Sequence, residues 1–492
     1  MIKWIKTGWI TIFSIGLIIG IVFLLICQGN FQTTASLLLI ATAIISIIII
    51  IIEKIPLTLT TFFFVPLSIT TIIGHTGSAL SIPSEFLILV IASTFLFSIT
   101  FYNKLDKKIL FHPLTFILLL DIGWQIFSSI FSSLPLVSMK RVFMHTVFIG
   151  TFYLAFAHLL KNKKFLMSPY LLYAFGLIPV IFYTLFKHAA YHFDPRVIFD
   201  LSQPFFPEHT SYGASIAFIL PALFIFTSKK INIPNQAFTK IIFYFVLPLL
   251  IIAEFLSFSR AAMISLLIVF LLYWAIRLFK IKLAHLILLL CSLTLLGMLF
   301  ERQLYELAKK NEAVSNDGSI TNHFESATNV TRDASNLERL NRWICAYRMF
   351  KERPLVGFGP GTYQFEYANF QTRDNKTYIS TDNGDKGNAH SEYFMYLSET
   401  GMPGLIIFLG LVFYTIYLGL KLYYTSQSRQ MKSIALAAVL GILTFFTHGI
   451  FNSFIDQDKI ASLVFSSMAI LTAIDVYHKN AIEEIEPVKN LN

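Results

Sequence analysis

Charged residues are scarce in this chain of 492 amino acids. Asp, Glu, Lys and Arg together make up 13%, whereas an average soluble domain contains about 25%. Hydrophobic residues make up 55% and aromatic residues 15%. A soluble fold of this length would need far more charged surface, so the composition excludes one. We predict an all-α polytopic membrane protein, because helices satisfy their own backbone hydrogen bonds in lipid.

Cysteine is also rare, and its three positions form no pattern. Cys27 and Cys291 fall in apolar runs, and Cys345 stands alone in a polar region, so no disulfide framework is implied. No Cys/His cluster has the spacing of metal ligands, and Asp382–Asp385 is too short for a calcium loop. We therefore expect no metal and no cofactor.

Long apolar runs recur along the chain. Runs of about 18–22 residues cross roughly 30 Å of hydrocarbon at about 1.5 Å per residue, and we place about fourteen of them. The predicted spans are 8–28, 34–53, 57–75, 84–102, 110–132, 138–160, 167–187, 211–228, 240–256, 261–279, 283–300, 403–420, 432–451 and 458–476. They predict N-terminal transmembrane helices over 1–300, an extracytoplasmic loop over 301–402, and C-terminal transmembrane helices with a cytoplasmic tail over 403–492.

The net charge of +10 would suit nucleic acid, but its distribution argues against that partner. With the N-terminus inside, basic residues concentrate in alternate short loops, as the positive-inside rule requires. The main ones are Lys54, Lys104, Lys107, Lys108, Lys161, Lys163, Lys164, Lys229, Lys230, Lys240, Arg277, Lys280, Lys282, Lys421, Arg429 and Lys432. We expect these loops to lie on the cytoplasmic side of the membrane, where they face anionic lipid head groups. The first apolar run lacks a small-residue cleavage site, so we expect an uncleaved first helix.

The segment 301–402 is too long to be a simple connection and is expected to carry function. Ser335 and Glu338 fit a capping box, and apolar residues then recur at helical spacing as far as Phe350. Pro354 should end that helix, since the residue before proline resists the α conformation. We interpret Gly357–Gly361 as tight-turn chemistry that lets the backbone approach the membrane or a ligand closely.

Two elements carry arginines that suit an anionic ligand. Arg339 and Arg342 lie one turn apart on the predicted helix, so their side chains can converge on one anion. Arginine suits phosphate because its planar fork donates two parallel hydrogen bonds; the alternative is a solvated face or a pair with Glu338. Arg260 lies at the outer mouth of two closely linked helices. It either binds an anionic ligand or reaches to lipid phosphates.

His390 immediately precedes the start of an apolar helix that is broken by glycine and proline. Ionisable groups at a membrane are costly to desolvate, which favours a functional interpretation. The alternative is a histidine that hydrogen-bonds a loop carbonyl. Glu399 is close enough in sequence to orient the same site, or it only terminates a short helix over 391–399.

Four elements together resemble a known family. His390-Ser391, nine further residues and Gly401–Gly404 resemble the H-[NSQ]-x9-G-x-x-G signature of the O-antigen ligase and polymerase superfamily. Ser259-Arg260 is similar to its Ser-Arg-Gly/Ala element. Arg339–Trp343 and Pro354–Tyr363 resemble its Arg-x-x-x-Trp and Pro-Leu-x-Gly-x-Gly elements. Ligases of this kind have fewer crossings than we place, so we expect about 12–14 transmembrane helices with a large, partly helical extracytoplasmic loop.

The resemblance implies a metal-independent, inverting glycosyltransferase in the bacterial cytoplasmic (inner) membrane, with its active site on the outer face. The donor would be an undecaprenyl-diphosphate-linked glycan, and the acceptor a hydroxyl of lipid A-core or another glycan. Arg260 and Arg339, with Arg342 as an auxiliary, would stabilise the leaving diphosphate as preorganised positive charge. His390 would be the general base, since an unperturbed imidazole has a pKa of about 6.5.

Further roles and alternatives stay open. His209, in the other outer loop, either helps to bind donor or acceptor or is an interfacial hydrogen-bonded histidine. A repeat-unit polymerase and a protein O-oligosaccharyltransferase would share the donor chemistry. A transporter or flippase would also be polytopic and basic. It should bury ionisable groups near mid-membrane, where Asp121 is the main candidate and Glu254 lies nearer the outer end.

Overall fold

The computed structural model of this chain describes six stretches of the sequence. They are residues 56–73, 78–102, 105–228, 240–279, 334–371 and 387–480. The predicted spans 8–28, 34–53 and 283–300 lie outside the described residues.

Helices dominate these stretches, and this confirms the predicted class of all-α polytopic membrane protein. Within the six stretches, nine helices are long and apolar enough to cross a membrane. They are α4 (Ser84–Tyr102), α6 (Pro113–Ile130), α7 (Pro135–Phe148) continuing into α8 (Phe156–Leu159), α9 (Ser168–Ala190), α10 (His209–Phe226), α13 (Arg260–Phe279), α19 (Glu392–Thr425), α20 (Arg429–His448) and α21 (Asp458–Ala473). Shorter apolar helices are α3 (Leu57–Leu67) and α12 (Leu247–Phe255).

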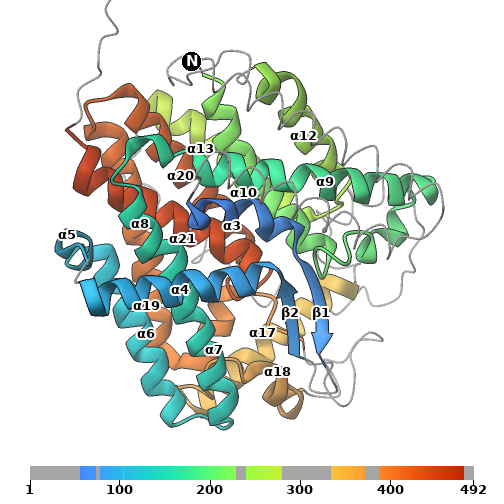
Figure 1. Cartoon of the computed structure of the whole chain (residues 1–492). Coiled ribbons are helices and arrows are strands. Elements are labelled where there is room, and N and C mark those ends of the chain that lie inside the picture. Colours follow the sequence, from blue (N-terminus) through green and yellow to red (C-terminus); the bar gives the residue numbers. More distant parts are fainter. Residues whose placement is uncertain are drawn as a thin grey trace, which may run out of the picture.

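Three helices form the centre of the bundle (Figure 1). In α10, α20 and α21, 83% of the apolar window is buried, against 17% in α4 and 22% in α13. The outer helices therefore present their side chains to lipid. Gly441 on α20 lets α10 come close, since a Cβ there would lie 2.7 Å from the Phe218 ring. Small residues are the usual means of close helix approach in membranes.

The predicted span 57–75 is wrong in its second half. Helix α3 ends at Leu67, and residues Ile69–Ile73 form a strand, β1. This strand pairs antiparallel with β2 (Ser78–Ile82), with Ile69 opposite Ile82. The β-branched run after Ser68 favours an extended chain. Apolar character alone could not distinguish this strand from a continuation of the helix.

The helix ends fall into two sets on opposite faces of the bundle. At one face, which we call the loop face, the Ser133 amide donates to the Phe358 carbonyl (2.9 Å) and the Thr70 amide to the Pro204 carbonyl (2.9 Å). At the opposite face, Lys161 Nζ lies 2.7 Å from Asp106 Oδ2. Among the described residues, the predicted outer loops lie at the loop face.

The second half of the long loop packs as a small unit at the loop face, below the strands in Figure 1. It contains α17 (Ala334–Glu352) and α18 (Tyr363–Glu366) around a local apolar cluster that includes Met349. The prediction that Pro354 ends the helix is confirmed. The capping box is wrong, because the helix already begins at Ala334 and Glu338 instead accepts from Arg342.

Candidate functional site

Two glycine-containing segments interlock beneath α17. Gly357 and Gly401 both have positive φ, 66° and 71°. A Cβ on Gly357 would lie 2.3 Å from the Glu399 carbonyl carbon, and one on Gly401 would lie 2.3 Å from the Leu355 carbonyl oxygen. Backbone hydrogen bonds join the segments, from the Gly359 amide to Glu399 (2.8 Å) and from the Met402 amide to Pro354 (2.9 Å). Gly357 therefore admits protein backbone, and Gly359 and Gly361 admit side chains of Ser132 and Arg141, not the membrane or ligand that we expected.

The kink in α19 depends on Gly401. Its φ of 71° and ψ of −172° lie in a region open essentially to glycine, and occupying it with another residue costs roughly 1–3 kcal/mol. We expect Gly401→Ala to lower the thermal unfolding temperature of the detergent-purified protein strongly. Gly410→Ala is the matched control, because no atom lies within 4 Å of a Cβ there. Equal unfolding temperatures for the two variants would contradict the interlock.

Glu399 lies at the centre of this interlock. Its carboxylate pairs with Arg141 of α7 and accepts from the Tyr363 amide at 3.1 Å. Arg141 also binds Asp456, Nη2 to Oδ2 at 2.7 Å and Nε to Oδ1 at 3.0 Å. The Glu399 side chain is only 2% exposed. These contacts give Glu399 a positioning role between α7, α18 and α19; its predicted substrate-binding role stays a prediction.

The two carboxylates around Arg141 should contribute unequally to stability. Glu399→Ala removes the partner that is buried, and breaking such a pair costs roughly 3–5 kcal/mol. Asp456→Ala removes a partner that is 39% exposed, and exposed pairs contribute about 0–1 kcal/mol. Thermal unfolding of both variants measures the difference. A smaller loss in Glu399→Ala than in Asp456→Ala would refute this assignment.

His390 occupies a strained backbone position. Its φ is 48°, in the left-handed region that residues other than glycine rarely adopt. The turn is held at both ends: the His390 amide donates to Asn388 Oδ1 (2.9 Å), and Trp343 Nε1 donates to the His390 carbonyl (3.2 Å). Strain of this kind persists where the surroundings impose it and is common at functional sites. The role of His390 as general base stays a prediction.

Arg342 helps to hold this turn. Its Nε donates to Glu338 Oε1 (3.0 Å) and its Nη1 to the Asn388 carbonyl (3.0 Å). The guanidinium also lies over the Tyr367 ring, 5.1 Å from its centroid. Arg342 is 4% exposed. This placement differs from the predicted convergence with Arg339 on one anion and matches the alternative pairing with Glu338.

Arg260 begins α13 directly after a tight turn. Ser257 Oγ donates to the Glu254 carbonyl (2.7 Å) and accepts from the Ser259 amide (3.2 Å). Gly213 of α10 packs on this turn, since a Cβ there would lie 2.7 Å from Ser259 Cβ. The contact brings Arg260 to the start of α10, where its charge acts on His209.

Arg339 of α17 acts on the same place. Its positive charge reaches both His209 and Glu208 at the start of α10. Burial raises the pKa of Glu208, against the lowering effects of the Thr210 hydroxyl and of Arg339. The Glu208 side chain makes no capping hydrogen bond to α10. The N-terminus of a helix favours anions. Arg260, Arg339 and the α10 N-terminus thus form one cationic site, with His209 at the start of that helix.

One residue of this region was not predicted from the sequence. His448, the last residue of α20, also lies within reach of the Arg339 charge. It falls inside the apolar run 432–451, so periodicity gave no sign that it reaches the loop face. Its position in the last turn of a predicted span, on the same side as His390, was the available signal.

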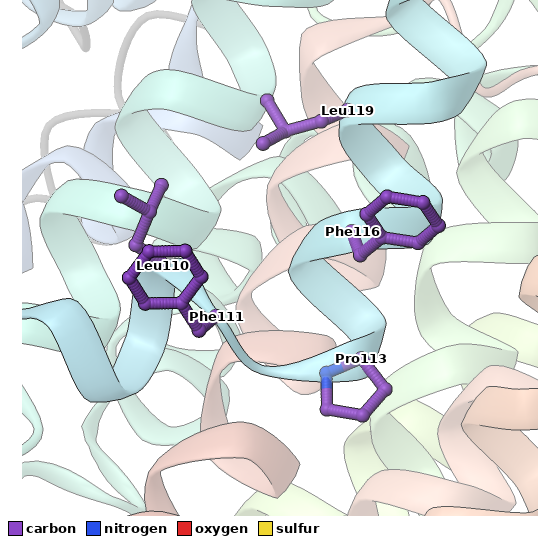
Figure 2. Close-up of a pocket in the computed structure, with 5 residues that line it drawn as sticks. All are labelled: Leu110, Phe111, Pro113, Phe116 and Leu119. Carbon is purple, nitrogen blue, oxygen red and sulfur yellow. The ribbon is translucent and has the colours of Figure 1, made fainter.

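An apolar pocket lies at the other end of the bundle (Figure 2). It is lined by Leu110, Phe111, Pro113, Phe116 and Leu119, around the start of α6. Phe111 is 79% exposed and Phe116 65% exposed. A wholly apolar lining on the lipid-facing surface suits lipid chains, so this pocket does not compete with the cationic site as a candidate active site.

Fold and site together define a polytopic helical membrane protein with a cationic site at one face. The O-antigen ligase family matches residues 243–409 of this chain. The match confirms the resemblance to the O-antigen ligase superfamily and supports glycosyl transfer of the ligase or polymerase kind. The matched segment contains Arg260, Arg339, Arg342, His390 and Glu399. A comparison with curated proteins finds no match.

Proposed function

We propose that this chain transfers a glycan from an undecaprenyl-diphosphate carrier to an acceptor hydroxyl, as an O-antigen ligase with lipid A-core as acceptor. One observation carries the proposal: the turn before Arg260 packs on Gly213 of α10, and Arg260 and Arg339, from distant parts of the matched segment, both act electrostatically on His209 at the start of that helix. Two fixed guanidinium groups at a helix N-terminus suit a diphosphate. Such a site is preorganised for the charge that develops when the diphosphate leaves.

The chemistry needs one base and one anion site. His390 takes the proton of the acceptor hydroxyl as its oxygen attacks the anomeric carbon of the donor glycan. The bond from that carbon to the diphosphate oxygen breaks, and the electron pair stays on the diphosphate. Arg260 and Arg339 stabilise this charge in the place of a metal ion. Direct attack inverts the anomeric centre.

The distribution of charge supports an outward-facing site. Among the short connections of the described residues, those at the opposite face carry most of the basic residues, and Lys161, Arg277 and Lys421 lie at or just after the ends of their helices. The positive-inside rule assigns that face to the cytoplasm. The loop face, with Arg339 and His390, would then open to the periplasm, where a flipped lipid-linked donor is presented in the inner membrane.

Transport is the competing class of function, and the buried carboxylate of Asp121 is the main feature in its favour. The carboxylate of Asp121 is 1% exposed and lies 2.7 Å from Gln125 Nε2 and 3.4 Å from His145 Nε2. Its Oδ2 also accepts from Tyr396. A network that joins α6, α7 and α19 in this way suits a fixed structural role, so we place transport below glycosyl transfer.

The banding of lipopolysaccharide in a deletion strain tests the proposal. Loss of all glycan-capped core is the result expected for a ligase. Lipid A-core that carries a single repeat unit would instead indicate that this chain catalyses the polymerase reaction. A protein O-oligosaccharyltransferase would leave the lipopolysaccharide ladder unchanged. In that case a surface protein would lose its glycan in the deletion strain and regain it on complementation.

A further inference from the structure

His448 is a buried histidine that the proposed mechanism does not use and that lies outside the matched segment. Its side chain ends α20 and is 2% exposed. Ring atom Nε2 lies 3.0 Å from Nδ2 of Asn452. Ring atom Nδ1 is buried and has no hydrogen-bond partner in the described part of the chain.

The orientation of the Asn452 amide decides where the proton of His448 sits. The structure turns Nδ2 of Asn452 toward the ring, and because an amide nitrogen can only donate, Nε2 accepts in this orientation. A neutral imidazole then carries its proton on Nδ1. The result is a buried N–H donor without an acceptor, a rare condition that calls for an explanation.

Two contacts, together with the electrostatic effect of Arg339, place this donor beside the cationic site. The charge of Arg339 reaches the ring of His448. The next residue, Gly449, accepts a hydrogen bond from the Glu392 amide at 2.8 Å, two residues after His390. Helices α10 and α20 pack closely through Gly441, and His209 begins α10 at the loop face. His209 Nδ1 is also buried and has no hydrogen-bond partner among the described residues.

We propose that Nδ1–H of His448 donates a hydrogen bond to a phosphate oxygen of the donor lipid's diphosphate, alongside Arg339. This inference rests on the proposed function and assigns His448 to anion binding, not to proton transfer. A helix C-terminus carries partial negative charge, so an anion at the end of α20 requires the positive charge of Arg339. The contribution of His448 should therefore depend on Arg339.

Two substitutions separate the two ring nitrogens. In His448→Asn, the amide nitrogen occupies the place of Nδ1, so the donor remains and the contact with Asn452 is lost. In His448→Gln, the amide oxygen occupies the place of Nε2 and accepts from Nδ2 of Asn452, so this contact remains and the Nδ1 donor is lost. Binding of undecaprenyl diphosphate to the full chain in detergent is measured for both, with thermal unfolding in parallel.

We expect His448→Gln to weaken binding about tenfold or more, as for loss of a hydrogen bond to a charged group, and His448→Asn to bind within about threefold of wild type. In an Arg339→Ala background, His448→Gln should cause no further loss. The reverse order, with Gln tolerated and Asn harmful, would assign His448 a purely structural role and overturn the inference. If His448→Gln does not fold, His448→Ala replaces it, and equal binding by the Ala and Asn variants overturns the inference.

The same assay keeps this inference distinct from the proposed function. If the wild type does not bind undecaprenyl diphosphate, the proposed function itself fails. If the wild type binds, Arg339→Ala loses binding and His448→Gln binds like wild type, only the role of His448 is overturned.

Discussion

Replacing His390 by alanine is expected to lower turnover by about 10²–10⁴-fold, the usual contribution of a positioned acid or base. Donor binding should change much less, because the arginines carry it. Wild-type activity should also fall as the solution becomes acidic, since a protonated imidazole cannot accept the acceptor's proton. Turnover and binding are measured separately on protein reconstituted in lipid vesicles.

The strained backbone at His390 provides controls that separate chemistry from folding. Asparagine and glycine tolerate the φ of 48° better than most residues do. His390→Asn and His390→Gly should therefore fold at least as well as wild type and still lose turnover. His390→Gln keeps hydrogen-bonding capacity without a base. A fully active His390→Gln variant would return His390 to the role of a residue that anchors its loop.

Arg339→Ala and Arg260→Ala should each abolish measurable transfer and leave the protein inserted and expressed. Removal of one preorganised group from a developing anion costs roughly 10²–10³-fold in turnover, and these two act on one leaving group. Lysine should restore activity only in part, because a point charge lacks the bidentate fork. The measurement is glycan transfer at equal amounts of inserted protein.

Each arginine has a matched control on its own helix. Lys351 of α17 lies over the Tyr347 ring, 4.8 Å from the ring centroid, and Arg277 of α13 lies near the other end of the helix that Arg260 begins. Lys351→Ala and Arg277→Ala should keep transfer near the wild-type level. Full activity in both Arg339→Ala and Arg260→Ala would remove the leaving-group role assigned to them.

Much of the fold could be predicted from the sequence because membrane-spanning helices are recognisable by their length and apolar character. The predicted span 84–102 and helix α4 have the same limits, and Pro354 ends α17 as expected. The prediction of a helix over Ile69–Ile73 was wrong for a physical reason. An apolar β-branched run is compatible both with a strand and with the end of a helix. Only its pairing with β2 distinguishes the two.

The site was harder to predict, because contacts between distant segments decide what each residue does. Spacing on α17 suggested that Arg342 would join Arg339, but Glu338 and the Asn388 carbonyl bind its guanidinium. The motif glycines carried a signal for close approach, yet only the structure shows that Gly357 and Gly401 approach each other's segments. His448 lies inside an apolar run, so periodicity gave no sign of it, and only its position in the last turn of a predicted span pointed to the loop face.

The most direct test of the central claim is transfer by the purified wild-type chain in vesicles. These contain an undecaprenyl-diphosphate-linked glycan and a lipid A-core acceptor, without added metal and with chelator present. The proposed function predicts that glycan appears on the acceptor with inverted anomeric configuration and that undecaprenyl diphosphate is released in equal amount. Retained configuration, or no transfer by wild-type protein that binds the donor, would contradict it.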